Sequence, residues 1–196
     1  MLFNGIKSIS IDSLGLSQIY ISQEKYASVS EWFSLDNMES FQPVSVHDFG
    51  NGIYTLTDGH TRALIAYENG LTMLPAIYDN DDIVTNPTGQ SLYKADMEWC
   101  ARFGLNHIKQ LGDRIIDKDL YKKLWIERCD RSYNLITKTT DSERLRLQKL
   151  VPNLFLYGAS EEMSELYFEN ASGDLFIYKE NSLILEMRDC KSRKIM

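Results

Sequence analysis

The chain has 196 residues, of which 43% are hydrophobic, and a formal net charge of −7 at pH 7. This length supports a substantial core, and eleven Tyr, eight Phe and three Trp exclude a largely disordered protein. No apolar run approaches the roughly 20 residues of a membrane span, and the first residues lack the pattern of a secretory signal peptide. The widely spaced Cys100, Cys129 and Cys190 favour free thiols. We therefore expect a cytoplasmic protein without membrane contacts.

The charges are distributed unevenly along the chain. Residues 1–82 contain eleven acidic and three basic side chains, whereas residues 83–196 contain seventeen acidic and eighteen basic ones. Proteins that bind duplex DNA usually present a basic face, because phosphate neutralisation supplies much of their affinity. The acidic first part therefore argues against duplex DNA as a partner. The basic residues Lys191, Arg193 and Lys194 are interpreted as a solvated terminus.

Strand and helix patterns alternate in the first eighty residues. Ser22 is placed as the N-cap of the first helix, and Asn51-Gly52 is a typical hairpin turn. The predicted elements, in chain order, are a strand at 6–11, a helix at 23–33, paired strands at 43–47 and 53–57, a helix at 63–69 and a strand at 75–78.

The polar, turn-rich stretch 79–90 predicts a boundary between a domain at 1–82 and a second region at 90–196. The second region is expected to contain helices near 91–103, 106–111, 117–129 and 141–150, then short strands near 154–157, 166–168, 175–178 and 183–185. The stretch 161–168 could also begin as a helix. We therefore expect a mixed α/β chain that ends in a small antiparallel sheet.

The motif Asp58-Gly59-His60-Thr61-Arg62 lies between a predicted strand and a predicted helix. Unpaired N–H groups at a helix start bind anions, and Gly59 allows close backbone approach. Arg62 suits phosphate, Asp58 suits a metal ion or a proton acceptor, and His60 suits proton transfer. A purely structural interpretation remains open, in which Asp58 is an N-cap and His60 and Arg62 are ordinary surface residues.

Residues 8–79 resemble the ParB/sulfiredoxin superfamily in element order and in this turn, where the family binds nucleotide phosphates. Gly59 and Arg62 match the sulfiredoxin motif, but His60 stands at the reactive cysteine, so sulfinic-acid reduction is not expected. The arginine-rich box of ParB partition proteins is matched only by Arg62-Ala63, so most CTP-binding arginines are missing.

The motif is most similar to that of the free-serine kinases of this superfamily, Asp-Gly-His-His-Arg. Asp58, Gly59, His60 and Arg62 match it, and Thr61 replaces the second histidine. The resemblance covers about seventy residues and implies ATP or ADP with Mg²⁺ as cofactors. It also implies a small hydroxylated metabolite as the acceptor.

The first predicted helix carries further candidate residues. Lys25 and Ser28 have the Lys-x-x-Ser spacing with which sulfiredoxins hold phosphates, and this spacing places both on one helical face. Kinases of this fold use a glutamate near the first helix as the base, which the resemblance assigns to Glu24, with Glu31 and Glu39 as alternatives.

The sequence thus predicts a ParB/sulfiredoxin-like nucleotide-dependent phosphotransferase. Asp58, His60 and Glu24 are the expected catalytic residues, and Asp58 is also the expected metal ligand. The residues expected to bind the nucleotide are Gly59, Thr61, Arg62, Lys25 and Ser28. The alternatives are a ParB-like nucleotide-gated nucleic-acid or partition factor and a non-catalytic nucleotide-binding module. The acceptor, the nucleotide base, the oligomeric state and the role of residues 90–196 are left open.

Overall fold

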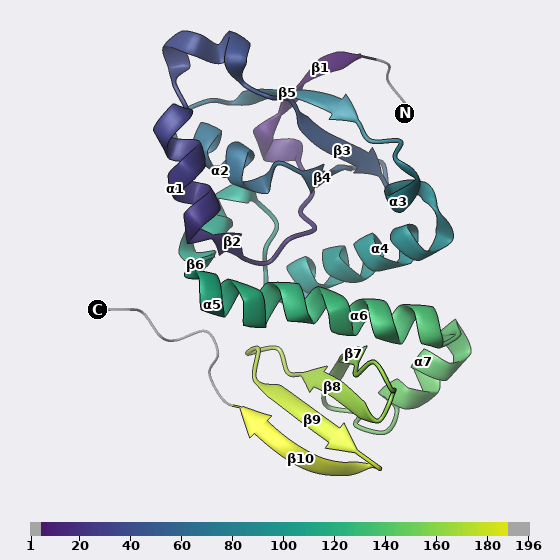
Figure 1. Ribbon diagram of the computed structural model, residues 1–196. Helices are drawn as coiled ribbons and strands as arrows, with labels where there is room; N and C mark the ends of the chain where they lie inside the picture. The colour runs from purple at the N-terminus through teal and green to yellow at the C-terminus, as the bar shows by residue number, and fades with distance from the viewer. Residues whose placement is uncertain (1–4, 188–196) are drawn as a thin grey trace. The chain divides into compact units, whose positions relative to one another are not determined.

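The computed structural model describes residues 5–187, except for the side chains of residues 37–39 and 187. Cys190 and the basic terminal residues discussed above lie outside the described residues. The chain is mixed α/β, as predicted, and divides into two compact units, Met1–Trp125 and Ile126–Met196 (Figure 1). Each helix between residues 5 and 187 is too short or too polar to traverse a bilayer.

The first unit contains a four-stranded mixed sheet in the order β1-β5-β3-β4. Its strands are β1 (Ile6–Ser10), β3 (Val44–Asp48), β4 (Tyr54–Asp58) and β5 (Met73–Tyr78). Strands β3 and β4 pair antiparallel, which confirms the predicted hairpin, whereas β3 and β5 pair in parallel. The carboxyl end of β4 therefore leads directly into the motif that starts at Asp58.

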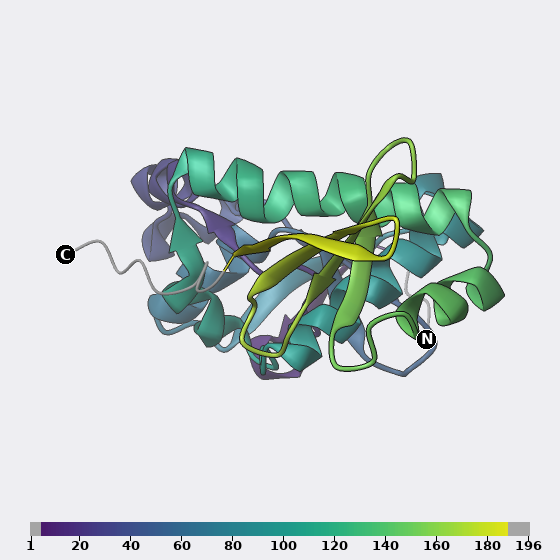
Figure 2. The same cartoon turned by 90° about the horizontal axis from the view of Figure 1, so that it is seen from below.

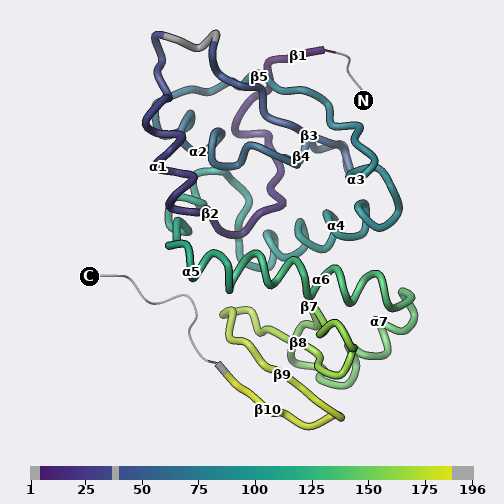
Figure 3. Tube along the Cα trace, in the orientation of Figure 1, coloured from purple at the N-terminus to yellow at the C-terminus, as the bar shows by residue number. Residues whose placement is uncertain are grey.

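Two helices of this unit, α1 (Gln23–Trp32) and α2 (His60–Glu68), pack side by side (Figure 3). Ser22 caps α1 as predicted, because its hydroxyl accepts a hydrogen bond from the backbone N–H of Lys25 at 3.4 Å. Helix α2 starts three residues earlier than predicted and buries His60 and residues 63–66. In contrast, α1 has no fully buried residue, so its side chains are at least partly exposed to solvent.

The division between the units falls after Trp125, whereas the sequence predicts it between residues 82 and 90. The predicted linker instead forms α3 (Asp82–Thr85) and the start of α4 (Pro87–Arg102). Asn86 caps α4 by accepting a hydrogen bond from Gly89 at 2.8 Å, and Pro87 occupies the first helical turn. Asn and Pro therefore act here as helix-start residues, although the same residue types are typical of loops.

The rest of the first unit consists of short elements. They are 3-10 segments at Ile11–Ser13, Leu35–Ser40 and Ile108–Arg114, strands β2 (Ile21–Ser22) and β6 (Ile115–Ile116), helix α5 (Lys118–Tyr121) and a π-helical turn at Lys122–Ile126. Strands β2 and β6 pair in parallel, which brings the segment after β6 beside the start of α1. This pairing explains why Lys118 reaches Glu24 at 3.5 Å.

The second unit contains two helices and a four-stranded antiparallel sheet (Figure 2). The helices are α6 (Glu127–Lys138) and α7 (Asp141–Gln148), and the strands are β7 (Phe155–Ala159), β8 (Glu165–Glu169), β9 (Leu175–Lys179) and β10 (Ser182–Met187). Consecutive strands pair in the order β7-β8-β9-β10, so the predicted meander is confirmed. Arg128 on α6 forms a buried 2.9 Å ion pair with Glu169 on β8, which joins this helix to the sheet.

Candidate functional site

The strand-to-helix turn of the motif depends on Gly59. This residue has φ of 95°, in the left-handed region that glycine tolerates best, and it directly precedes α2. A Cβ atom at this position would lie 2.8 Å from Cγ1 of Val44 on the neighbouring strand. The backbone therefore turns close against β3, and α2 begins without a side-chain cap from Gly59. As at any helix start, the first N–H groups of α2 have no partner within the helix.

Arg62 lies one turn into α2 and folds back over the turn. Its Nη2 atom lies 2.7 Å from Oδ2 of Asp58, and its Nη1 atom donates to the backbone carbonyls of Gln42 and Pro43 at 3.0 and 3.1 Å. Within the described residues these contacts use three of the five guanidinium N–H groups. Arg62 is 17% exposed and Asp58 is 75% exposed. The arginine is thus fixed in position while two donors remain for a ligand.

His60 occupies a different environment from the one the sequence suggested. Its side chain is buried, and its Nε2 atom accepts a hydrogen bond from the backbone N–H of Ser17 at 3.2 Å. Burial lowers the pKa of His60 to about 4, although the charge of Asp58 acts in the opposite direction. His60 is therefore neutral near pH 7 and holds the segment around Ser17. This contact gives it a positioning role; we assign it no proton transfer.

The purely structural interpretation of the motif also differs from the observed geometry. Gly59, and not Asp58, occupies the N-cap position of α2. His60 is buried and Arg62 is mostly buried, so neither is an ordinary surface residue. Only Asp58 is freely exposed, which leaves its carboxylate accessible to a ligand or metal ion.

The structure brings all the predicted site residues together. One pocket of about 470 Å³ lies between α1 and the start of α2, a volume typical of small-molecule sites. It is lined by the predicted residues Glu24, Lys25, Ser28, Asp58, Gly59, His60, Thr61 and Arg62, and by Gln18 and Val29. Side chains separated by about thirty residues in sequence therefore face one cavity.

The contribution of α1 to this pocket is polar and exposed. Glu24, Lys25 and Ser28 are all exposed and line the pocket from the first two turns of the helix. Glu24 also approaches Lys118 at 3.5 Å. Of the two alternative bases, Glu31 lies on α1 but does not line the pocket, and the side chain of Glu39 lies outside the described residues.

Gln18 is a pocket residue that the sequence interpretation missed. Its position follows from residues 14–18, which run along β4. Gly15 donates to the carbonyl of Tyr54 at 2.9 Å and accepts from the N–H of Leu56 at 3.0 Å. The amide nitrogen of Gln18 donates to the carbonyl of Tyr20 at 2.6 Å, which orients the side chain. No periodic pattern indicates such a non-local contact, so the sequence carries no signal for Gln18.

The residues present are compatible with a phosphate-bound magnesium ion, but not with an ion held by the protein alone. Among residues 5–187, no three His, Cys, Asp or Glu side chains are grouped so that they could hold a metal. Mg²⁺ in phosphate-transfer sites is usually held by one or two carboxylates together with the substrate phosphates. Asp58 can supply one such carboxylate, provided that it exchanges its contact with Arg62.

No family model matches this chain, and no curated protein matches its sequence. The resemblance of residues 8–79 to the ParB/sulfiredoxin superfamily therefore remains a prediction from the motif and the order of elements.

Proposed function

We propose that the pocket between α1 and α2 binds a nucleotide and transfers one of its phosphoryl groups to a small hydroxylated metabolite. The observation that carries this proposal is the convergence of eight residues, chosen from the sequence alone, on one pocket of about 470 Å³. The three cationic or hydroxyl side chains around the start of α2 have the chemistry that phosphate binding requires; they are Lys25, Thr61 and Arg62.

The phosphate groups would lie over the N-terminus of α2. The helix dipole and the N–H groups of its first turn favour an anion there. Arg62 offers its two remaining N–H donors, and Lys25 adds a flexible positive charge from the opposite wall of the pocket. The hydroxyl groups of Thr61 and Ser28 supply neutral hydrogen bonds. These contacts fix the phosphate chain for in-line attack.

The exposed carboxylate of Glu24 is the proposed base. It takes the proton of the acceptor hydroxyl, whose oxygen attacks the terminal phosphorus while the bond from phosphorus to the nucleotide oxygen breaks. Asp58, together with the phosphates, would hold a Mg²⁺ ion, which would neutralise part of the phosphate charge. His60 takes no proton in this scheme, since its Nε2 atom is occupied by Ser17. Through this hydrogen bond it holds the segment before Gln18 against the start of α2.

One observation favours the second candidate, a non-catalytic nucleotide-binding module. Arg62 and Asp58 already form an ion pair, and Arg62 also anchors the carbonyls of Gln42 and Pro43. These contacts would stabilise the turn even without chemistry. Binding and turnover must therefore be measured separately.

The test is a thermal-shift panel with ATP, ADP and CTP, with and without Mg²⁺, followed by ³¹P NMR with free serine and small polyols as acceptors. A kinase is stabilised by a nucleotide in the presence of Mg²⁺ and converts it only when an acceptor is present. Binding without conversion supports the module. Stabilisation by CTP together with tight, nucleotide-dependent duplex DNA binding supports the partition factor, and no stabilisation by any nucleotide rejects all three functions.

A further inference from the structure

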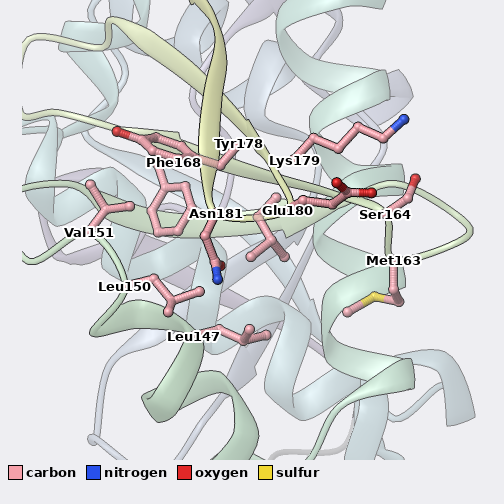
Figure 4. A pocket seen from close by; sticks show the side chains of 11 residues that line it. Leu147, Leu150, Val151, Met163, Ser164, Phe168, Tyr178, Lys179, Glu180 and Asn181 are labelled. Carbon is pink, nitrogen blue, oxygen red and sulfur yellow. The ribbon is translucent and has the colours of Figure 1, made fainter.

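The second unit contains a pocket of its own, of about 490 Å³ (Figure 4). It lies between the end of α7, strands β8 and β9, and the turns that follow β7 and β9. It is lined by Leu147, Leu150, Val151, Met163, Ser164, Leu166, Phe168, Tyr178, Lys179, Glu180 and Asn181. None of these residues belongs to the nucleotide pocket, so the proposed phosphotransferase activity does not explain them.

The pocket has an apolar interior and a polar rim. Leu147, Leu150, Val151 and Leu166 form the interior, and Phe168, also part of the lining, is fully buried. In Figure 4 the ammonium of Lys179, the carboxylate of Glu180 and the hydroxyl of Ser164 lie together at one side, away from Leu150. Sites of this size that combine apolar walls with a few polar groups are typical of small amphipathic ligands.

Three residues of this pocket have a left-handed backbone conformation. In the described part of the chain, the non-glycine residues with positive φ are Met163 at 58°, Glu180 at 50° and Asn181 at 63°. All three line the pocket. Glu180 and Asn181 are the two loop residues of the β9–β10 hairpin, where a type I′ turn requires positive φ at both positions. At Met163 a left-handed conformation is unfavourable, because this residue is not glycine. Met163 stands where a tight turn favours glycine, and it adds a thioether to the pocket wall.

The charged groups of the rim are free to bind a ligand. Within residues 5–187, the side chains of Lys179, Glu180 and Asn181 make no hydrogen bond or ion pair. Lys179 and Glu180 carry opposite formal charges on adjacent residues. A ligand with a single charge is therefore attracted by one and repelled by the other, whereas a zwitterion is attracted by both.

We propose that this pocket binds a free α-amino acid with a large apolar side chain. The ligand's ammonium group lies beside Glu180 and its carboxylate beside Lys179, and its side chain enters the apolar interior among Leu147, Leu150 and Leu166. The second unit thereby gains a ligand-binding role that does not depend on the nucleotide pocket.

The test uses three probes with one phenyl ring and different charges: L-phenylalanine, the anion 3-phenylpropanoate and the cation 2-phenylethylamine. Each is titrated into the full chain and followed by NMR. We expect phenylalanine to bind at least tenfold more tightly than the other two. Glu180→Gln should then improve binding of the anion selectively, and Lys179→Met should improve binding of the cation. Equal binding of the three probes, or no binding of phenylalanine at millimolar concentration, overturns the proposal.

Two leucines of the same helical region provide a matched control for the position of the ligand. Leu150 lines the pocket and is 45% exposed, whereas Leu145 is 64% exposed and does not line it. Neither substitution by Ala should prevent folding, because neither side chain is buried in the core. We expect Leu150→Ala to weaken phenylalanine binding at least fivefold and Leu145→Ala to leave it unchanged. Equal effects of the two variants would show that the ligand binds elsewhere.

Discussion

The imidazole Nε2 of His60 accepts a hydrogen bond from the backbone N–H of Ser17, which lies 3.2 Å away. Ser17 in turn donates its hydroxyl to the carbonyl of Leu56 at 2.7 Å. The two contacts join the segment before Gln18 to β4 and to the first turn of α2. His60 therefore helps to hold the pocket residues in place, and the folded protein requires its neutral form.

Folding stability should fall as the pH drops through the range in which free histidine becomes protonated. Burial lowers the pKa of His60 from 6.5 to about 4, so the unfolded chain takes up the proton first. The contribution of neutral His60 to the free energy of unfolding is complete above pH 6.5 and is lost as the pH falls to 4. The total loss is about 3 kcal/mol. Urea unfolding at pH 7 and pH 4.5 measures most of this difference.

His60→Gln is the control for this prediction, because its amide oxygen can still accept from Ser17 but does not titrate in this range. The carboxylates of Asp48 and Glu143 also have lowered pKa values, but their contributions are lost only below the pKa values of the free side chains, 3.8 and 4.5. A decline between pH 6.5 and 4.5 that is equally steep in wild type and in His60→Gln would contradict the assignment.

Two exposed lysines near Glu24 should differ in their effect on nucleotide binding. Lys25 lines the pocket, whereas Lys118 contacts Glu24 from outside it. Lys25→Met would remove the proposed charge-assisted phosphate contact and should weaken binding of Mg²⁺–ATP by roughly 1.5–3 kcal/mol. Lys118→Met should change the dissociation constant by less than about twofold, since exposed ion pairs contribute little. Fluorescence titration with a labelled nucleotide compares them, and equal losses would indicate only a general charge effect.

Asp58→Asn should preserve the fold and abolish magnesium-dependent turnover. The Asp58 side chain is 75% exposed, so the ion pair with Arg62 contributes at most about 1 kcal/mol to stability. The amide retains the shape of the side chain but has no negative charge for a metal ion. Thermal unfolding and a phosphoryl-transfer assay over a range of Mg²⁺ concentrations measure the two effects. Full turnover in the variant would show that Asp58 does not hold the metal ion.

The sequence predicted those parts of the site that are formed by residues close together in the chain. The strand, the glycine turn and the helix follow one another directly, so the neighbourhood of Asp58 and Arg62 follows from helical spacing. Ser22 was recognisable as a cap because the helix pattern starts at the next residue. The Lys25 and Ser28 spacing likewise depends only on residues within one helix.

The missed features all depend on contacts between distant segments. The burial of His60 depends on Ser17, forty-three residues earlier, and Gln18 enters the pocket through backbone pairing with β4. The division between the units falls after Trp125, later than predicted, since Asn86 and Pro87 are typical of loops and also of helix starts. Only the packing of residues 82–125 within the first unit distinguishes a helix start from a linker at these residues.

The most direct test of nucleotide binding at the α2 turn is isothermal titration of Mg²⁺–ATP into wild type and Arg62→Ala. Arg62 also holds the carbonyls of Gln42 and Pro43, so the variant is first shown to be folded by circular dichroism at the titration temperature. We expect one site per chain in wild type and an affinity at least tenfold lower in the variant, equivalent to roughly 1.5–3 kcal/mol. Equal affinities in the two proteins, or no binding heat in wild type, would contradict a phosphate site at this turn.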